Sequence, residues 1–199
     1  MNNVYIAFLS PNNKMGRFIR FFTGIKYSHV AISLDGSLKQ MYSFARRKRR
    51  LPFAGGFIVE YPIHYFTSSG EVPLKVVSIT LDDIQYTRLV SIIEDFSNRK
   101  EDLIYNTIDA LSSALSHPIL IKDCYTCISF CCYLLGLNRV YTIPELEKQL
   151  TDSIIYVGNY KEYVGKAEYI DPFFFEDLSI HRIVYLTFKH FGLLFKRLL

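Results

Sequence analysis

The first eighty residues of the chain carry hydrophobic side chains in short, mostly uninterrupted runs, with turn-forming residues between them. Runs of this length are typical of buried β-strands. An Asp-Gly pair at positions 35–36 separates two of the runs and indicates a hairpin. The pattern predicts strands at residues 4–9, 28–34, 39–44, 57–60 and 74–79.

Beyond residue 80 the apolar positions recur every three or four residues, which predicts helices. Asp82 and Gln85 have the spacing of a capping box, and the helix that follows should end near Asn98. No repeat and no Gly/Ser linker divides the chain, so we expect one α+β domain over residues 1–199. The remaining predicted elements are helices at 15–22, 107–115 and 123–135, a short helix after Pro144 and a strand at 154–157.

The composition is that of a folded protein, since 50% of the residues are hydrophobic and 16% are aromatic. A net charge of +4 is too modest to indicate nucleic-acid binding, and we expect none. No apolar run is long enough to span a bilayer, and the N-terminus lacks the basic region of a secretory signal. We therefore expect a cytoplasmic protein.

The four cysteines of the chain, Cys124, Cys127, Cys131 and Cys132, fall within nine residues. Such clustering cannot be a disulfide framework, and four thiols along one helix cannot converge on a zinc ion, so neither a metal nor an organic cofactor is expected. Thr126 is a good N-cap that places Cys127 in a first helical turn, where the macrodipole favours a thiolate. Core packing of all four thiols and a redox-active CxxC motif are the alternatives.

A thiol hydrolase also needs an imidazole beside the sulfur and a third group that orients the imidazole. His29 stands at the entry of a predicted buried strand, a common position for a catalytic base. Taken alone, a histidine at such a position is more often structural. His64, His117 and His181 have no partner pattern, and we interpret them as structural or surface residues.

Five segments resemble, in order, the motifs of the circularly permuted papain-like hydrolases related to the NlpC-type cell-wall amidases. The lecithin–retinol acyltransferases share this arrangement, in which the histidine strand precedes the cysteine helix. The resemblance covers about residues 4–136, and Ile128 stands where the family usually has Ser. The segments are SHVAI at 28–32, MYSFAR at 41–46, GGFIVE at 55–60, YN at 105–106 and TCISF at 126–130.

The resemblance implies an antiparallel sheet packed against helices, with the nucleophile at a helix N-terminus. It further implies that Cys127 is the nucleophile, that His29 is the general base and that Tyr105 lies near the oxyanion. Ser43 aligns best with the orienting third residue, and Gln40 and Glu60 are its rivals. Arg46 matches the family motif and is expected to be structural or to contact substrate, as is Glu60.

Five consecutive basic residues occupy positions 46–50. They could form a solvated loop, a nucleic-acid or nuclear-import patch, or an anchor for an anionic substrate. Their position directly after the Ser43 strand favours the third interpretation.

The C-terminal segment, about residues 182–199, carries Arg182, Lys189 and Lys196 at intervals of seven, with apolar residues on the other side. If the chain is helical from Phe188 onward, this segment is a basic amphipathic helix. It could dock on the domain's own core or bind a membrane surface.

The leading hypothesis is a cysteine peptidase or amidase that cleaves an amide or ester bond through an acyl-enzyme on Cys127. Its substrate would be a peptide, an N-acyl amide or a lipid-like molecule. Two alternatives stay open: a non-catalytic binding module of the same fold, and a membrane-associated thiol acyltransferase.

Overall fold

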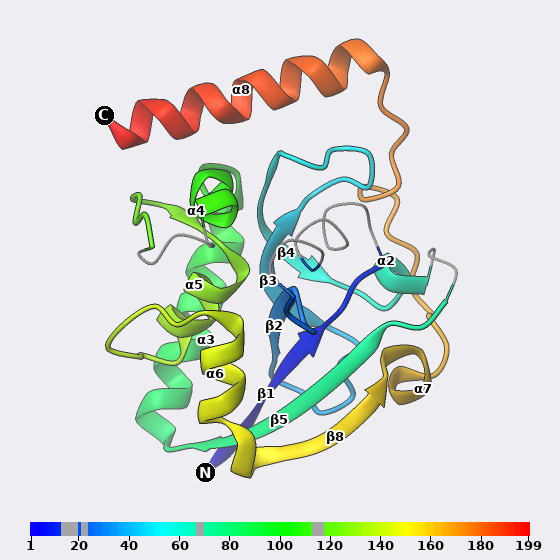
Figure 1. Ribbon diagram of the computed structural model, residues 1–199, viewed down its shortest axis with the longest axis vertical. Helices are drawn as coiled ribbons and strands as arrows, with labels where there is room; N and C mark the ends of the chain where they lie inside the picture. The colour runs from blue at the N-terminus through cyan, green and yellow to red at the C-terminus, as the bar shows by residue number, and fades with distance from the viewer. Residues whose placement is uncertain (13–19, 21–23, 67–69, 113–117) are drawn as a thin grey trace.

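An eight-stranded sheet organises the protein in a computed structural model that describes residues 1–12, 20, 24–66, 70–112 and 118–199 (Figure 1). The strands are β1 (Asn2–Leu9), β2 (His29–Ser33), β3 (Met41–Arg46), β4 (Gly55–Glu60), β5 (Pro73–Leu81), β6 (Ile104–Tyr105), β7 (Cys124–Tyr125) and β8 (Ile154–Asn159). Their order across the sheet is β7-β6-β4-β3-β2-β1-β5-β8. Neighbours pair antiparallel except β6 and β7, which run parallel.

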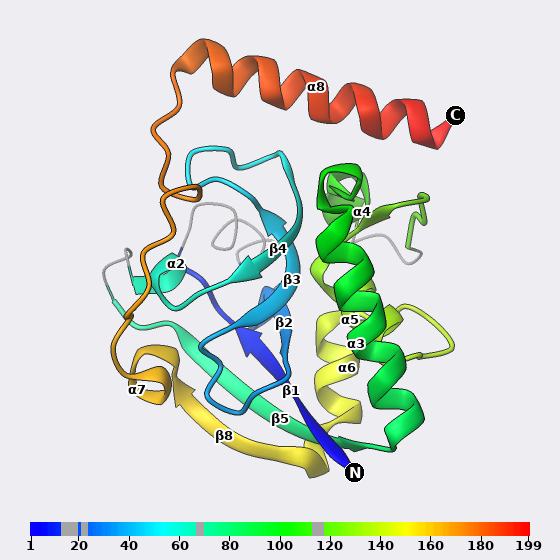
Figure 2. The same ribbon diagram turned by 180° about the vertical axis from the view of Figure 1, so that it is seen from behind.

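Helices cover both faces of this sheet. Those of the described residues are α2 (Ile63–Phe66), α3 (Asp83–Asn98), α4 (Thr107–Ser112), α5 (Cys127–Leu134), α6 (Ile143–Gln149), α7 (Tyr160–Val164) and α8 (Ile180–Leu198). Helices α3, α5 and α6 lie on one face, while α2 and α7 lie on the other (Figures 1 and 2). The long helix α8 lies across one end of the molecule. The α+β class predicted from the sequence is confirmed.

Strand β1 lies inside the sheet, between β2 and β5, and divides its side chains between two cores. Val4, Ile6 and Phe8 pack in the core under α3 and α5. Ala7 and Leu9 belong to the core on the opposite face, with α7. Successive side chains of a strand point to opposite faces, so a strand covered on both sides needs apolar residues at nearly every position. This requirement explains the uninterrupted apolar runs of the sequence.

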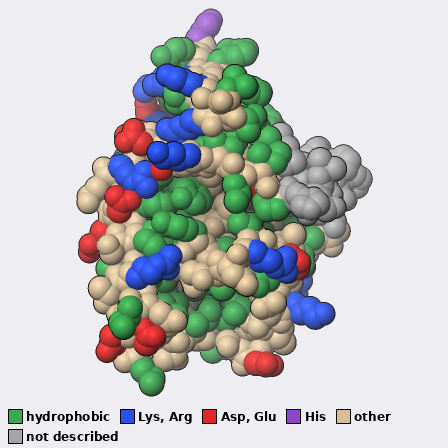
Figure 3. Space-filling view, turned by 90° about the vertical axis from the view of Figure 1, so that its left-hand side faces the viewer, with side chains coloured by type: hydrophobic (Ala, Val, Ile, Leu, Met, Phe, Trp, Pro, Cys, Tyr) green, Lys and Arg blue, Asp and Glu red, His purple; other side chains and the backbone are tan. Residues whose placement is uncertain are grey.

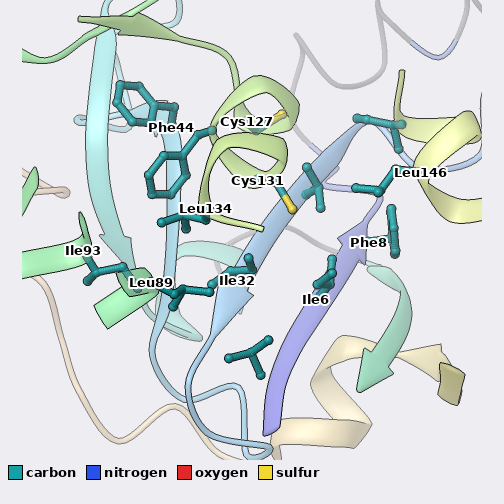
Figure 4. Packing of buried hydrophobic residues seen from close by; sticks show 14 of the residues in the cluster. Ile6, Phe8, Ile32, Phe44, Leu89, Ile93, Cys127, Cys131, Leu134 and Leu146 are labelled. Carbon is teal, nitrogen blue, oxygen red and sulfur yellow. The ribbon is translucent and has the colours of Figure 1, made fainter. Parts of the chain in front are cut away.

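Aromatic rings pack between α5 and the sheet. The ring of Phe130 on α5 lies 5.1 Å from that of Phe44 and 5.6 Å from that of Phe57, centroid to centroid. Phe96 of α3 completes the group, 5.5 Å from Phe130. Figure 4 shows Phe44 beside the first turns of α5. Aromatic pairs at these separations add to the free energy of burial, so the position of α5 over β2 and β3 is well determined.

All six predicted strands are confirmed, with ends that shift by no more than two residues. The helix predicted at 123–135 begins later, at Cys127, because Cys124 and Tyr125 form the short strand β7. The last helix begins earlier than Phe188, at Ile180, where the Ser179 hydroxyl caps it. The helix predicted at 107–115 is described only as far as residue 112, and that at 15–22 lies, apart from position 20, outside the described residues.

The basic residues at 46–50, here called the basic loop, hold the segment 165–179 that links α7 to α8, here called the strap. Lys48 pairs with Glu176 and donates a 3.2 Å hydrogen bond to the carbonyl of Phe173. Arg50 lies 3.3 Å from Asp177. Through these contacts the basic loop joins two parts of the chain, a role that none of the three interpretations from the sequence included.

Replacing Lys48 with Met should loosen the strap. The Lys48 side chain is 8% exposed, and the substitution removes its hydrogen bond to the carbonyl of Phe173 as well as its pairing with the more exposed Glu176, so the free energy of unfolding should fall by about 1–2 kcal/mol. We expect faster proteolytic cleavage within 165–179. The control is Lys39→Met, because the Lys39–Glu168 pair is well exposed and should contribute less than about 1 kcal/mol. Equal cleavage of both variants would contradict the role of the basic loop.

Candidate active site

The first turn of α5 positions Cys127. Thr126 is its N-cap: the Thr126 hydroxyl accepts a 3.2 Å hydrogen bond from the backbone N–H of Ser129, and the Ser129 hydroxyl accepts one of 2.8 Å from the backbone N–H of Thr126. This reciprocal capping box places Cys127 at the first helical position. Asp123, at the start of the helix predicted from the sequence, instead lies before β7 and has a positive φ of 57°. Figure 4 shows Cys127 and Cys131 on one side of the helix, a turn apart.

His29, the first residue of β2, is the partner of this thiol. Helix α5 packs on β2 and β3, and this packing brings the Cys127 sulfur close enough to the His29 ring to raise its pKa. The Nε2 atom of His29 lies 2.7 Å from Oε1 of Glu60. Since Glu60 occupies Nε2, the other ring nitrogen, Nδ1, is the one that remains for the sulfur of Cys127. The imidazole is therefore held between a thiol and a carboxylate, and its side chain is only 12% exposed.

Glu60, the last residue of β4, makes the contact with His29 that the sequence analysis assigned to Ser43. Ser43 lies on the neighbouring strand β3, and its hydroxyl donates to Oε1 of Glu60. Tyr65 of α2 donates to the other carboxylate oxygen. Ser43 thus acts on the imidazole only through Glu60. The sequence favoured Ser43 over Glu60 as the residue that orients His29, and the geometry favours Glu60 over Ser43.

The opposite charges of His29 and Glu60 determine the protonation state of each residue. Burial would lower the pKa of His29, but the negative charge of Glu60 and the interactions of the protonated ring with the Cys127 sulfur and the Glu60 carboxylate, both of which accept from it, raise this pKa to about 10. For Glu60, burial favours the neutral acid, yet the charge of His29 and hydrogen bonds from His29, Ser43 and Tyr65 lower its pKa to about 2. At neutral pH the pair is therefore an imidazolium and a carboxylate.

Tyr105 reaches the same region through the parallel pairing of β6 with β7. Its register partner is Tyr125, two residues before Cys127. Burial, followed by the charges of Cys127 and Asp109, raises the pKa of the Tyr105 phenol. The phenol therefore stays protonated at neutral pH and can donate a hydrogen bond near the sulfur. Tyr105 therefore lies near enough to Cys127 for the charge of the sulfur to act on the phenol.

Arg46 supports the basic loop and its packing against the strap. It donates a 3.1 Å hydrogen bond to the carbonyl of Arg49, and its guanidinium lies 5.6 Å from the centroid of the Phe174 ring in the strap. Of the two roles considered for Arg46, these contacts favour the structural one.

The other cysteines and histidines have different surroundings. Cys124, Cys131 and Cys132 are free, buried thiols, and burial raises the pKa of each. His64 lies 3.1 Å from Asp171 and stacks on Phe174, so it is structural. His181 is exposed, and His117 lies outside the described residues. Within the described ranges no three His, Cys, Asp or Glu side chains form a group able to hold a metal ion.

Tyr65 is the residue of the site that the sequence analysis missed. It lies on the four-residue helix α2, directly beyond the loop that follows Glu60, and nothing distinguishes it among fifteen tyrosines. The one signal in the sequence is that Tyr65 stands five residues after Glu60, and this spacing points to Tyr65 only if Glu60 is taken as the residue that contacts His29.

Comparison of the chain with protein-family models, with curated proteins and with solved structures found no match.

Proposed function

We propose that the chain is a cysteine-dependent hydrolase that cleaves an amide or ester bond through an acyl-enzyme on Cys127. The observation that carries the proposal is the placement of the largely buried His29 ring between the Cys127 sulfur and the Glu60 carboxylate, 2.7 Å from the carboxylate. This is the arrangement of nucleophile, base and orienting acid that thiol hydrolysis requires.

In this mechanism the Cys127 thiolate attacks the carbonyl carbon of the substrate, with the His29 imidazolium as its counter-charge. The backbone N–H of Cys127 at the start of α5 and the Tyr105 phenol would stabilise the oxyanion. As the tetrahedral intermediate collapses, the bond to the leaving group breaks and His29 gives that group its proton. A water molecule, deprotonated by His29, then hydrolyses the thioester and releases the acid.

The same contacts support a permuted papain-like fold. The histidine strand β2 precedes the nucleophile helix α5 in the chain, and a mostly antiparallel sheet carries both the base and its acid. The substrate that this chemistry accepts is an acyl compound, which includes peptides, N-acyl amides and lipid-like esters.

Alkylation at pH 6 tests the proposal. An ordinary thiol is less than about 1% ionised at this pH, so iodoacetamide should react with Cys127 at least about 100-fold faster than with the other three cysteines. Mass spectrometry of peptides identifies the labelled residue. His29→Ala should slow this labelling by about 100-fold, whereas Cys131→Ser, the matched control on the same face of α5, should not change it.

Labelling alone would not separate an enzyme from a binding module with a reactive thiol. With a p-nitrophenyl acyl ester, an acyl-enzyme should release about one p-nitrophenol per chain in a rapid burst, and Cys127→Ser should give none. Slow, uniform labelling of all four thiols, or labelling without ester cleavage, would favour the binding module.

A further inference from the structure

Helix α8 presents two apolar faces, and only one of them packs against the rest of the protein. Ile183 and Leu186 join a small cluster with the chain that follows the basic loop. Further along the helix, Leu194 is fully buried against β6 and β7. Between these contacts the buried His190 lies 3.0 Å from the hydroxyl of Thr107 on α4. These residues account for the docking of the helix.

The second apolar face points away from the domain. Its side chains fall within an arc of about 80° on a helix of 3.6 residues per turn. Phe188 is 75% exposed, although a phenylalanine on a helix with a packed inner face has no structural need to face water. The outer apolar stripe consists of Ile180, Val184, Phe188, Phe195 and Leu198, all exposed.

A row of basic residues occupies the other flank of the exposed surface of α8, centred about 140° around the helix from the middle of the outer apolar stripe. Arg182, Lys189 and Lys196 lie seven residues apart, and the helix contains no acidic residue at all. Arg182 pairs with Glu176, whereas Lys189 and Lys196 form no ion pair within the described ranges. Figure 3 shows blue and green side chains next to one another in the upper part of the molecule, where α8 lies.

We propose that the outer face of α8 binds the surface of an anionic membrane, with the helix lying in the plane of the interface. The apolar stripe would enter the boundary between headgroups and acyl chains, and the basic row would contact lipid phosphates. No described helix is both long and apolar enough to cross a bilayer. A lipid surface fits better than a second copy of the chain, because pairing two such faces would bring two acid-free basic rows together.

Vesicle sedimentation tests this surface. The full chain should bind vesicles of phosphatidylcholine with about 30% phosphatidylserine at least tenfold more tightly than phosphatidylcholine vesicles, and added salt should weaken the binding. Lys189→Gln with Lys196→Gln should reduce the affinity about 30-fold. Phe188→Ser with Phe195→Ser should reduce it at least tenfold. Ile84→Ser on α3, where the side chain is also exposed, is the matched control and should leave the affinity unchanged.

Three results would overturn the proposal: equal binding to both vesicle types, undiminished binding after both phenylalanines are replaced, or sedimentation equilibrium showing that these replacements dissociate a dimer. The last would identify a second copy as the occupant. The outer side chains are exposed, so thermal unfolding should be unchanged in every variant. Membrane binding and the thiol chemistry are separable, because Cys127→Ser should bind vesicles normally and Phe188→Ser should still be alkylated at Cys127.

Discussion

Replacing Glu60 with Gln should lower the free energy of unfolding by about 3 kcal/mol at pH 7 and should remove most of the reactivity of Cys127 at pH 6. Gln preserves the volume of Glu60 but leaves the buried His29 without its counter-charge. Burial then favours the neutral imidazole, which is a poor partner for a thiolate. Urea denaturation measures the stability, and the rate of iodoacetamide labelling at pH 6 measures the reactivity.

Ser43→Ala provides the comparison. It removes one hydrogen bond to the Glu60 carboxylate but keeps the charge, so a loss of about 1.5 kcal/mol and a much smaller effect on labelling are expected. The two variants together test whether Glu60 or Ser43 is the group that acts on His29. Wild-type labelling in Glu60→Gln, or an equal defect in Ser43→Ala, would show that the carboxylate is not the orienting acid.

The stability of the protein should be greatest in mildly acidic solution and should fall as the pH rises toward 10. His29 has a folded pKa of about 10 against an ordinary value of 6.5, so its contribution is complete below pH 6.5 and is lost between pH 6.5 and 10. Glu60 has a folded pKa of about 2 against 4.5, so its contribution is complete above pH 4.5 and is lost between pH 4.5 and 2. The loss of stability at high pH and the loss at low pH both come from breaking the His29–Glu60 ion pair, which contributes about 3 kcal/mol to the free energy of unfolding.

The alkaline side gives the clearer measurement. On the acid side His190 also titrates, because burial lowers its pKa to about 4 and its contribution disappears as the pH falls from 6.5 to 4. Urea denaturation at pH 6 and pH 9.5 should show a decrease of about 3 kcal/mol for the wild type and a much smaller one for Glu60→Gln. If the two proteins lose the same amount, the pair does not control the alkaline stability.

The strands and the position of the nucleophile could be predicted because local chemistry determines them. Uninterrupted apolar runs require cover on both faces, and this requirement places β1 inside the sheet. The capping box that begins α5 involves only Thr126 and Ser129, which are three residues apart, so it can be predicted without knowledge of distant contacts. The boundary at Cys127 was misjudged because β7 depends on pairing with β6, nearly twenty residues earlier, which no local pattern reveals.

The choice between Ser43 and Glu60 could not be made from the sequence, because both lie in matching motifs and both are buried. They occupy neighbouring strands, where Ser43 pairs with Ile58 and Glu60 pairs with Met41. The longer glutamate side chain reaches the imidazole, and the serine hydroxyl reaches only the glutamate. The contacts of Lys48 and Arg50 in the basic loop could not be predicted for a related reason, since their acidic partners, Glu176 and Asp177, lie more than 120 residues further along the chain.

The order of the strands also bears on how the site is assembled during synthesis. Residues 1–81 contain β1 to β5, neighbours in the order β4-β3-β2-β1-β5, and they include both His29 and Glu60. All four cysteines come after residue 123, which at about 5–20 residues per second leaves the ribosome several seconds later. The base and its acid can therefore assemble in a nascent chain that still has no thiol to oxidise, and the nucleophile helix completes the site.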